Sequence, residues 1–389
     1  MKELSIALAT ETAELEALAP IEGWAFGFPA TDALEWLKGA GSGRVRVARE
    51  GARVVGGLLE IPMGQWFGGK SVTTLGLAGV AVAPETRGRG LALRLIQQTL
   101  RAARERGFAL STLYPSTFGL YRKAGYELGG SYCRFNLQLR RLPRSRSKLE
   151  ITSLSAEEHA EVAQLYGAVA RHRPGYLDRG DYIWQRVRRP HGEVALGFGV
   201  RDNEGLAGYL MLKPNKGMPI QFAVTDFVTR TPEAFETLLG LLADHGTTAE
   251  SASWKGGPAD ARLLGLPDRV VKVEVEDYWM LRLLNVPAAL LARGYPHIDA
   301  AVEIAVDDAF LPENEGRHAL VVEQGQPRLA SGGDLPFARL SAGSLAALYS
   351  GFIGAHELRL TGKLDADERA VQALAALFAG PAPGIADYF

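Results

Sequence analysis

A glycine-rich stretch early in the chain has the composition of a phosphate-binding turn. Residues 79–92 read Gly-Val-Ala-Val-Ala-Pro-Glu-Thr-Arg-Gly-Arg-Gly-Leu-Ala, and apolar residues then recur at helical spacing up to Arg106. Such a turn between a strand and a helix directs several backbone N–H groups at one point, where the helix dipole adds about half a positive charge. The stretch therefore predicts a seat for the pyrophosphate of a nucleotide, with Gly88 and Gly90 keeping side chains out of the way.

Two common phosphate motifs do not fit this turn. A P-loop requires Gly-Lys-Ser/Thr at the helix entry, where this chain has Gly90, Leu91 and Ala92. A dinucleotide fingerprint requires a third glycine where Leu93 stands, in a βαβ unit that opens the domain, whereas a hairpin is predicted first, over residues 44–61. What remains is the pattern Arg87-x-x-Gly90-x-Ala92, and a plain glycine-rich turn that caps a helix stays an alternative.

Tyr121 is the side chain best suited to proton transfer. It lies in the segment Leu-Tyr-Arg-Lys-Ala-Gly-Tyr at residues 120–126, after a predicted strand at 108–113. A phenol with a pKa near roughly 10 is protonated at about pH 7 and can donate a proton to a departing thiolate, an effect on the order of 10² to 10⁴ in rate. A core tyrosine that packs its helix onto the sheet is the alternative, and Tyr126 is expected to play that packing role.

Together, the two segments resemble the signatures of the GCN5-related N-acetyltransferases (GNAT), which read Gln/Arg-x-x-Gly-x-Gly/Ala and Tyr-x-x-x-Gly-Phe/Tyr. The resemblance implies that the chain uses acetyl-CoA as co-substrate and that Tyr121 is the general acid. It also implies that the strand before the turn, the turn itself and the first helical residues bind the cofactor. These residues are Val80, Ala81, Val82, Arg87, Gly88, Arg89, Gly90, Leu91 and Ala92.

The length of 389 residues predicts two or three domains. A hairpin, strand and helix order in the first third returns in weaker form after a basic stretch around residues 140–148, which is interpreted as a linker. The last hundred or so residues read as a compact α+β unit, with a strand expected at 357–361 and a helix at 365–378. The sequence thus predicts an α/β catalytic domain at 1–143, a degenerate copy at 149–285 and an α+β domain at 286–389.

Over nearly its full length the chain is similar to the enhanced-intracellular-survival (Eis) family. The segments that carry the resemblance are 82–90, 121–126, 277–283, 288–290 and the terminal phenylalanine. It implies two tandem GNAT-like domains followed by a sterol-carrier-protein-like domain, assembly into a homo-hexamer, and acetylation of amines that include aminoglycosides. It further implies that the α-carboxylate of Phe389 reaches the active site as general base; a C-terminus that only packs on its domain stays an alternative.

The acceptor is less well defined than the cofactor. Loop residues 85–89 and 115–117 depart from the family pattern, so an aminoglycoside-like amine, a polyamine and a lysine side chain all remain open. An aromatic set is expected to line the acceptor cavity, or else to be core: Trp24, Phe26, Trp36 and Trp66. The alternative function is a non-catalytic carrier of apolar ligands with a vestigial acetyltransferase fold.

Composition excludes several other classes. A net charge of -1 argues against a nucleic-acid partner, and no apolar run approaches the ~20 residues that cross a bilayer. A single cysteine, Cys133, expected to be buried, and an amino terminus without an apolar leader predict a cytoplasmic protein. The seven histidines show no ligand spacing, so no metal is expected.

Overall fold

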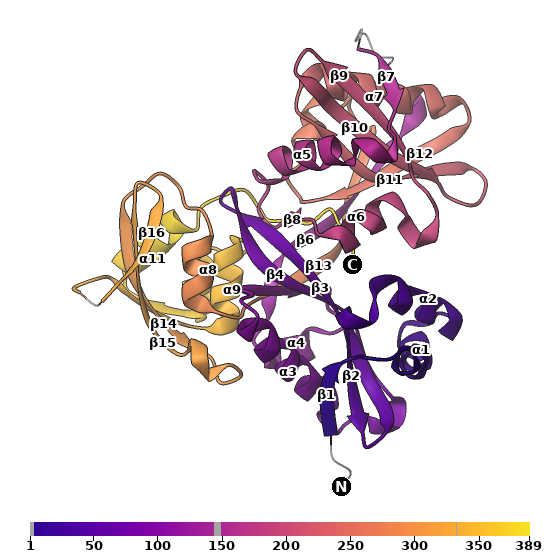
Figure 1. The fold of residues 1–389 in the computed structure, drawn as a ribbon. Coiled ribbons are helices and arrows are strands. Elements are labelled where there is room, and N and C mark those ends of the chain that lie inside the picture. Colours follow the sequence, from indigo (N-terminus) through magenta and orange to yellow (C-terminus); the bar gives the residue numbers. More distant parts are fainter. Residues whose placement is uncertain (1–3, 144–148, 332) are drawn as a thin grey trace.

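The computed structural model describes residues 4–143, 149–331 and 333–389, which form three units around a common centre (Figure 1). Residues 144–148 of the predicted basic linker lie outside the described residues, as do residues 1–3 at the amino terminus. Within the described part of the chain, no helix is long and apolar enough to cross a membrane.

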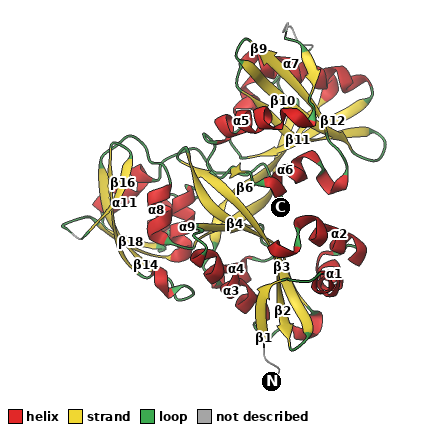
Figure 2. Ribbon diagram, viewed as in Figure 1, coloured by secondary structure: helices red, strands yellow, loops and turns green. Residues whose placement is uncertain are grey.

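The first unit is a mixed sheet with helices on both faces (Figure 2). Leu18 and Leu37 belong to the core on one face of the sheet, and Leu95 and Leu100 to the core on the other. The hairpin predicted over 44–61 is present, although its second strand continues to Phe67. The elements in chain order are β1 (Leu4–Leu8), α1 (Thr12–Phe26), α2 (Ala30–Ala40), β2 (Val45–Glu50), β3 (Arg53–Phe67), β4 (Lys70–Val82), α3 (Leu91–Glu105), β5 (Leu110–Leu113), α4 (Phe118–Lys123) and β6 (Glu127–Gln138).

The second unit repeats the order of the first, which confirms the predicted copy. Its strand-to-helix junction differs from the glycine turn, since Thr231 caps the helix by accepting a 3.2 Å hydrogen bond from the Ala234 N–H and Pro232 follows. The elements are β7 (Ile151–Ser153), α5 (His159–Ala170), β8 (Leu177–Asp178), α6 (Asp181–Arg188), β9 (Leu196–Asp202), β10 (Gly205–Pro214), β11 (Ile220–Thr229), α7 (Pro232–Asp244), β12 (Ala249–Gly256) and β13 (Val271–Leu283).

The third unit is an α+β fold built on a 5-stranded sheet in the order β16-β15-β14-β17-β18. The strand predicted at 357–361 is wrong: this segment is a helix, because Ala355 and Leu358 are buried at helical spacing whereas Leu360 is exposed. The elements are α8 (Val286–Ala292), β14 (Ala300–Asp307), β15 (Gly316–Glu323), β16 (Gln326–Ala330), β17 (Phe337–Ser341), α9 (Ala342–Ser350), α10 (Ala355–Leu360), β18 (Leu364–Ala366) and α11 (Glu368–Leu377).

The first two units share a single 13-stranded sheet, because the last strand of the second unit lies inside the first. Residues 280–283 of β13 pair with β5, and most of β13 pairs with β6. In return, the far half of β6 pairs with β12 of the second unit. The predicted domain boundaries at 1–143 and 149–285 therefore stay predictions. By sequence β13 belongs to the second domain, but in space it completes the sheet of the first.

Candidate active site

The glycine turn presents a row of backbone donors at the start of α3. Gly88 and Gly90 have positive φ values of 79° and 72°, which only glycine adopts without strain. The first backbone bond into the helix runs from Arg94 N–H to the Gly90 carbonyl, at 3.1 Å. Among the described residues, the N–H groups of residues 88–93 donate to no acceptor, so the turn can hold the oxygens of a pyrophosphate.

The charged groups around this turn leave one arginine unpaired. Arg89 lies 3.5 Å from a Glu50 oxygen in an exposed ion pair, and Arg53 bonds Glu85. The guanidinium of Arg87 is exposed and has no partner within the described part of the chain. Arg87 is therefore available to an anion bound at the N–H row. Of the predicted cofactor residues 87–92, Leu91 has its side chain in the core.

Strand β4 separates from β5 just before the turn. The two parallel strands pair from Thr74–Leu110 to Leu77–Leu113, and β4 then continues alone on that side to Val82. Pairing with β3 skips between Gly57 and Leu59, which places a bulge at Gly79 with a φ of 57°. On its β5 side, the backbone of Val80 to Val82 therefore has no strand partner among the described residues, so an extended arm can bond to it there.

Tyr121 lies on α4 with its side chain almost wholly buried. Burial raises the pKa of its phenol to about 12, and a hydrogen bond with Ser116 partly opposes that rise. Tyr121 is therefore protonated at about pH 7, as a general acid must be. Tyr126 packs edge-on against it, at 6.0 Å between ring centroids, and bonds Ser111 Oγ at 2.7 Å, in agreement with its predicted packing role.

The C-terminal tail leaves the third unit and crosses to the sheet of the first, so that the chain ends near the centre of the molecule (Figure 1). Gly384 N–H bonds the Pro174 carbonyl at 3.0 Å, and Ile385 N–H bonds the Ser131 carbonyl at 3.3 Å. The ring of Phe389 is buried beside β4: a Cβ atom placed on Gly76 would lie 3.0 Å from it. Tyr114, directly after β5, packs edge-on against the same ring at 5.5 Å.

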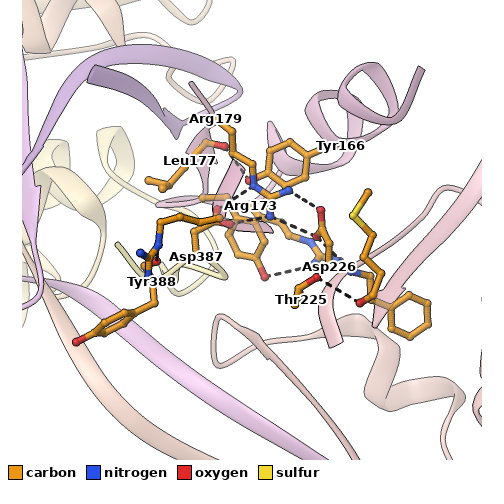
Figure 3. Close-up of polar contacts among 12 residues, drawn as sticks. Tyr166, Arg173, Leu177, Arg179, Thr225, Asp226, Asp387 and Tyr388 are labelled. Atoms are coloured by element: carbon orange, nitrogen blue, oxygen red, sulfur yellow. Dashed lines mark hydrogen bonds and ion pairs between the residues drawn. The ribbon is translucent and has the colours of Figure 1, made fainter. Parts of the chain in front are cut away.

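A buried charge cluster in the second unit anchors this tail (Figure 3). Arg179, between β8 and α6, bonds Asp387 of the tail at 2.9 Å and Asp226 of β11 at 2.5 Å. Tyr209 donates to Asp226 at 2.7 Å, and the guanidinium lies 3.7 Å from the centre of the Tyr166 ring. Burial alone would lower the pKa of the guanidinium, but the two carboxylates raise it well above its ordinary value. The second unit thus holds Asp387, two residues before the terminal carboxylate.

The four aromatic residues predicted to line the acceptor cavity do not all meet. Trp36 lies against the β4 bulge and donates to Tyr182 Oη of α6 at 2.8 Å. Trp24 and Phe26, on α1, are exposed, Trp24 by 73%. Trp66 pairs with Ser71 at the opposite end of the β3–β4 hairpin and packs against the core of the second unit.

One charged residue of the site was missed by the sequence prediction. Glu22 lies on the buried face of α1 with Leu15, Leu18 and Ala19, and its carboxylate lies beside the β4 bulge. The sequence contains one signal for it: Glu22 follows the apolar residues Leu18 and Ala19 by four and three positions, which places an acid on the apolar face of the helix. Burial raises the pKa of Glu22 well above its ordinary value.

Three parts of the chain match known domain families. Residues 7–129 and 175–283 each match an acetyltransferase (GNAT) domain, and residues 286–386 match a sterol carrier protein domain. These matches confirm the predicted fold class of two GNAT-like units and a sterol-carrier-like unit.

Known proteins match this chain over most or all of its length. The chain is 33% identical to a GCN5-related N-acetyltransferase from Anabaena variabilis ATCC 29413, whose crystal structure gives a TM-score of 0.94 with 100% of both chains covered. It is 26% identical to N-acetyltransferase Eis of Mycobacterium tuberculosis (strain ATCC 25177 / H37Ra), over 86% of each chain. Its fold is also similar to that of Eis1 from Mycobacterium abscessus, with a TM-score of 0.79 and 24% identity over 100% of both chains.

Proposed function

Because this chain belongs to the GCN5-related N-acetyltransferase family, in the three-domain form of the Eis proteins, we propose that it acetylates an amine directly from acetyl-CoA in a ternary complex. The observation that carries the proposal is the row of unpaired N–H groups at residues 88–93, next to the part of β4 that has separated from β5. The pyrophosphate binds that row and Arg87, and the pantetheine arm bonds the backbone of Val80 to Val82.

The reaction forms a C–N bond and breaks the C–S bond of the thioester. The amine attacks the acetyl carbonyl, and the departing thiolate takes a proton from the Tyr121 phenol. The burial that raises the Tyr121 pKa to about 12 also raises that of a thiol held in the same pocket, so that donor and acceptor stay matched.

The second proton passes from the attacking amine to the terminal carboxylate of Phe389, directly or through a water molecule. A terminal carboxylate has a pKa near roughly 3.5 in water and is a weak base for an amine, but an apolar setting raises that value. Support for this role comes from the anchoring of the tail by Arg179 and from the buried ring of Phe389 beside β4.

The proposed acceptor is an amine of the aminoglycoside, polyamine or lysine side-chain kind. The family resemblance supports a cytoplasmic homo-hexamer. The mass of the protein in solution by light scattering tests the assembly.

Release of free CoA thiol from acetyl-CoA, with a panel of aminoglycosides, polyamines and lysine peptides, tests the reaction. Tyr121→Phe and a chain lacking Phe389 are expected to lose turnover while still binding acetyl-CoA. Phe389→Ala keeps a terminal carboxylate and should retain part of the activity, and Tyr388→Phe, at an exposed ring, is the matched control. Failure of the wild type to bind acetyl-CoA would overturn the proposal.

A further inference from the structure

A cavity of about 470 Å³ lies where the three units meet (Figure 1). The first unit contributes residues 68–70 at the tip of the β3–β4 hairpin, and the second contributes residues within 171–174, after α5. The third contributes residues 293 and 350–351, together with residues 378–381, where the C-terminal tail begins. A volume of this size lies within the range of small-molecule sites, roughly 300 to 1,000 Å³.

The cavity is separate from the proposed cofactor site. Strand β4 begins at Lys70, which lines the cavity, and ends at Val82, just before the glycine turn. Its 13 residues, at about 3.3 Å each, put up to roughly 40 Å of strand between the two places. A ligand in the cavity would therefore occupy a site of its own.

The lysine and arginine side chains of the cavity have no acid to balance them. They belong to Lys70, Arg171 and Arg293, and no acidic residue is among the described residues of the lining. None of the three forms an ion pair with another described residue. Arg171 donates to the Gly69 carbonyl at 3.3 Å, so a neutral group is its hydrogen-bond partner. Because like charges repel, the cavity attracts an anion.

Arg293 differs from the other buried arginines of the described residues. The other four each bond a carboxylate: Arg46, Arg179, Arg262 and Arg282. Arg293 is 4% exposed and donates from Nε and Nη1 to the carbonyls of Gly294 and Tyr349, whereas its Nη2 has no acceptor in the described part of the chain. Burial lowers the pKa of this guanidinium, and no carboxylate opposes that change. Arginine nevertheless stays charged in proteins, so this buried charge calls for a partner from outside the chain.

We propose that the cavity binds a small phosphorylated compound, whose phosphate is held by Arg293, Arg171 and Lys70. This inference does not rest on the proposed acetyl transfer. The planar fork of a guanidinium matches the oxygens of a phosphate, and a lysine adds a point charge. A phosphate ester carries about two negative charges at pH 7, which balances three cations better than one carboxylate does. Phe378 and Pro381 line another part of the cavity and can pack against the carbon part of the ligand.

The test is calorimetric titration of three probes into the full-length protein: glycerol 3-phosphate, inorganic phosphate and glycerol. Saturating acetyl-CoA is present, so that the probes do not compete for the glycine turn.

Two changes remove the proposed phosphate contacts. Arg293→Met removes the buried charge, and a double variant, Lys70→Gln with Arg171→Gln, removes the two exposed ones. Arg369→Gln, at an exposed arginine of α11 that does not line the cavity, is the matched control. Thermal unfolding verifies that each variant is folded, and the double variant alone decides if Arg293→Met does not fold.

Glycerol 3-phosphate is expected to bind the wild type more tightly than inorganic phosphate does, and glycerol is expected not to bind. The bound ester should raise the thermal midpoint, because it contacts all three units of the folded state. Its affinity should fall by about tenfold or more in Arg293→Met and in the double variant, since charged hydrogen bonds are lost. Arg369→Gln should keep the wild-type affinity.

Absence of binding by both phosphate probes would overturn the inference, as would wild-type affinity in the folded variants of the cavity. Inorganic phosphate that binds as tightly as the ester would overturn the assignment of an organic ligand.

Discussion

Asp387→Asn is expected to slow acetyl transfer without unfolding the protein or weakening acetyl-CoA binding. Arg179 bonds the carboxyl groups of both Asp226 and Asp387 inside the buried cluster. Removal of the Asp387 charge leaves Arg179 paired with Asp226 at 2.5 Å, and the fold of the second unit is preserved. The tail loses charged hydrogen bonds from Arg179 Nε and Nη2, which contribute about 1.5 to 3 kcal/mol each.

If the loss weakens the placement of the terminal carboxylate by about 1 kcal/mol, which is half the free energy of one such bond, the fraction of correctly placed tails falls several-fold. If the full free energy of one bond is lost, kcat falls by about tenfold or more. Arg179→Met is the contrasting variant, because it strands two buried carboxylates and should cost about 3 to 5 kcal/mol of stability. Asp365→Asn, an exposed acid of the same C-terminal unit, is the matched control.

Thiol release measures kcat, equilibrium titration measures acetyl-CoA affinity, and urea unfolding ranks the stabilities. The expected order of stability is wild type, then Asp387→Asn, then Arg179→Met well below both. A wild-type kcat in Asp387→Asn would refute the reasoning that the second unit positions the terminal carboxylate, as would an Arg179→Met protein as stable as wild type.

Three further outcomes follow from the site. Tyr121→Phe should lower kcat by about 10²- to 10⁴-fold with acetyl-CoA affinity intact, because the phenol acts only during proton transfer; pre-steady-state thiol release and equilibrium binding check this. Gly79→Ala should destabilise the protein by about 1 to 3 kcal/mol, since its φ is 57° and its Cβ would meet the Trp36 ring, whereas Gly39→Ala on an open helix face should be neutral or stabilising in the same urea titration. Because burial raises the folded-state pKa of Glu22 above its value of about 4.5 in the unfolded chain, the folded state binds the extra proton between the two values, and stability falls as pH rises through the folded-state pKa. Denaturant midpoints measured from pH 5 to about pH 8 should therefore fall more steeply for wild type than for Glu22→Gln, and parallel curves would contradict this.

The local features of the site could be predicted from the sequence, because they depend on residue type and short spacing. The turn at Gly88 and Gly90 lies where a strand meets an amphipathic helix, and Tyr121 follows at a distance that local elements fix. The segment at 357–361 was misassigned because apolar residues at 358 and 360 imitate a strand over so short a run.

The features that depend on distant pairing could not be predicted in this way. Whether Glu22 faces water or the core depends on how α1 packs against β4. The sequence of α1 alone does not determine this packing. The same holds for Trp66, which belongs to an aromatic-rich first third and yet packs against the second unit. The bond between Arg179 and Asp387 joins residues that are far apart in the chain, and no local pattern signals it.

The place of β13 between β5 and β6 also sets the order in which this protein can mature during synthesis. Residues Trp279 to Leu283 are fully buried in the first unit, yet they leave the ribosome only after the whole second unit has been made. Until then, β5 and β6 expose unpaired edges, which favour aggregation or pairing with another chain. The first unit therefore completes its sheet only after the second unit has been translated, because the two units share β13.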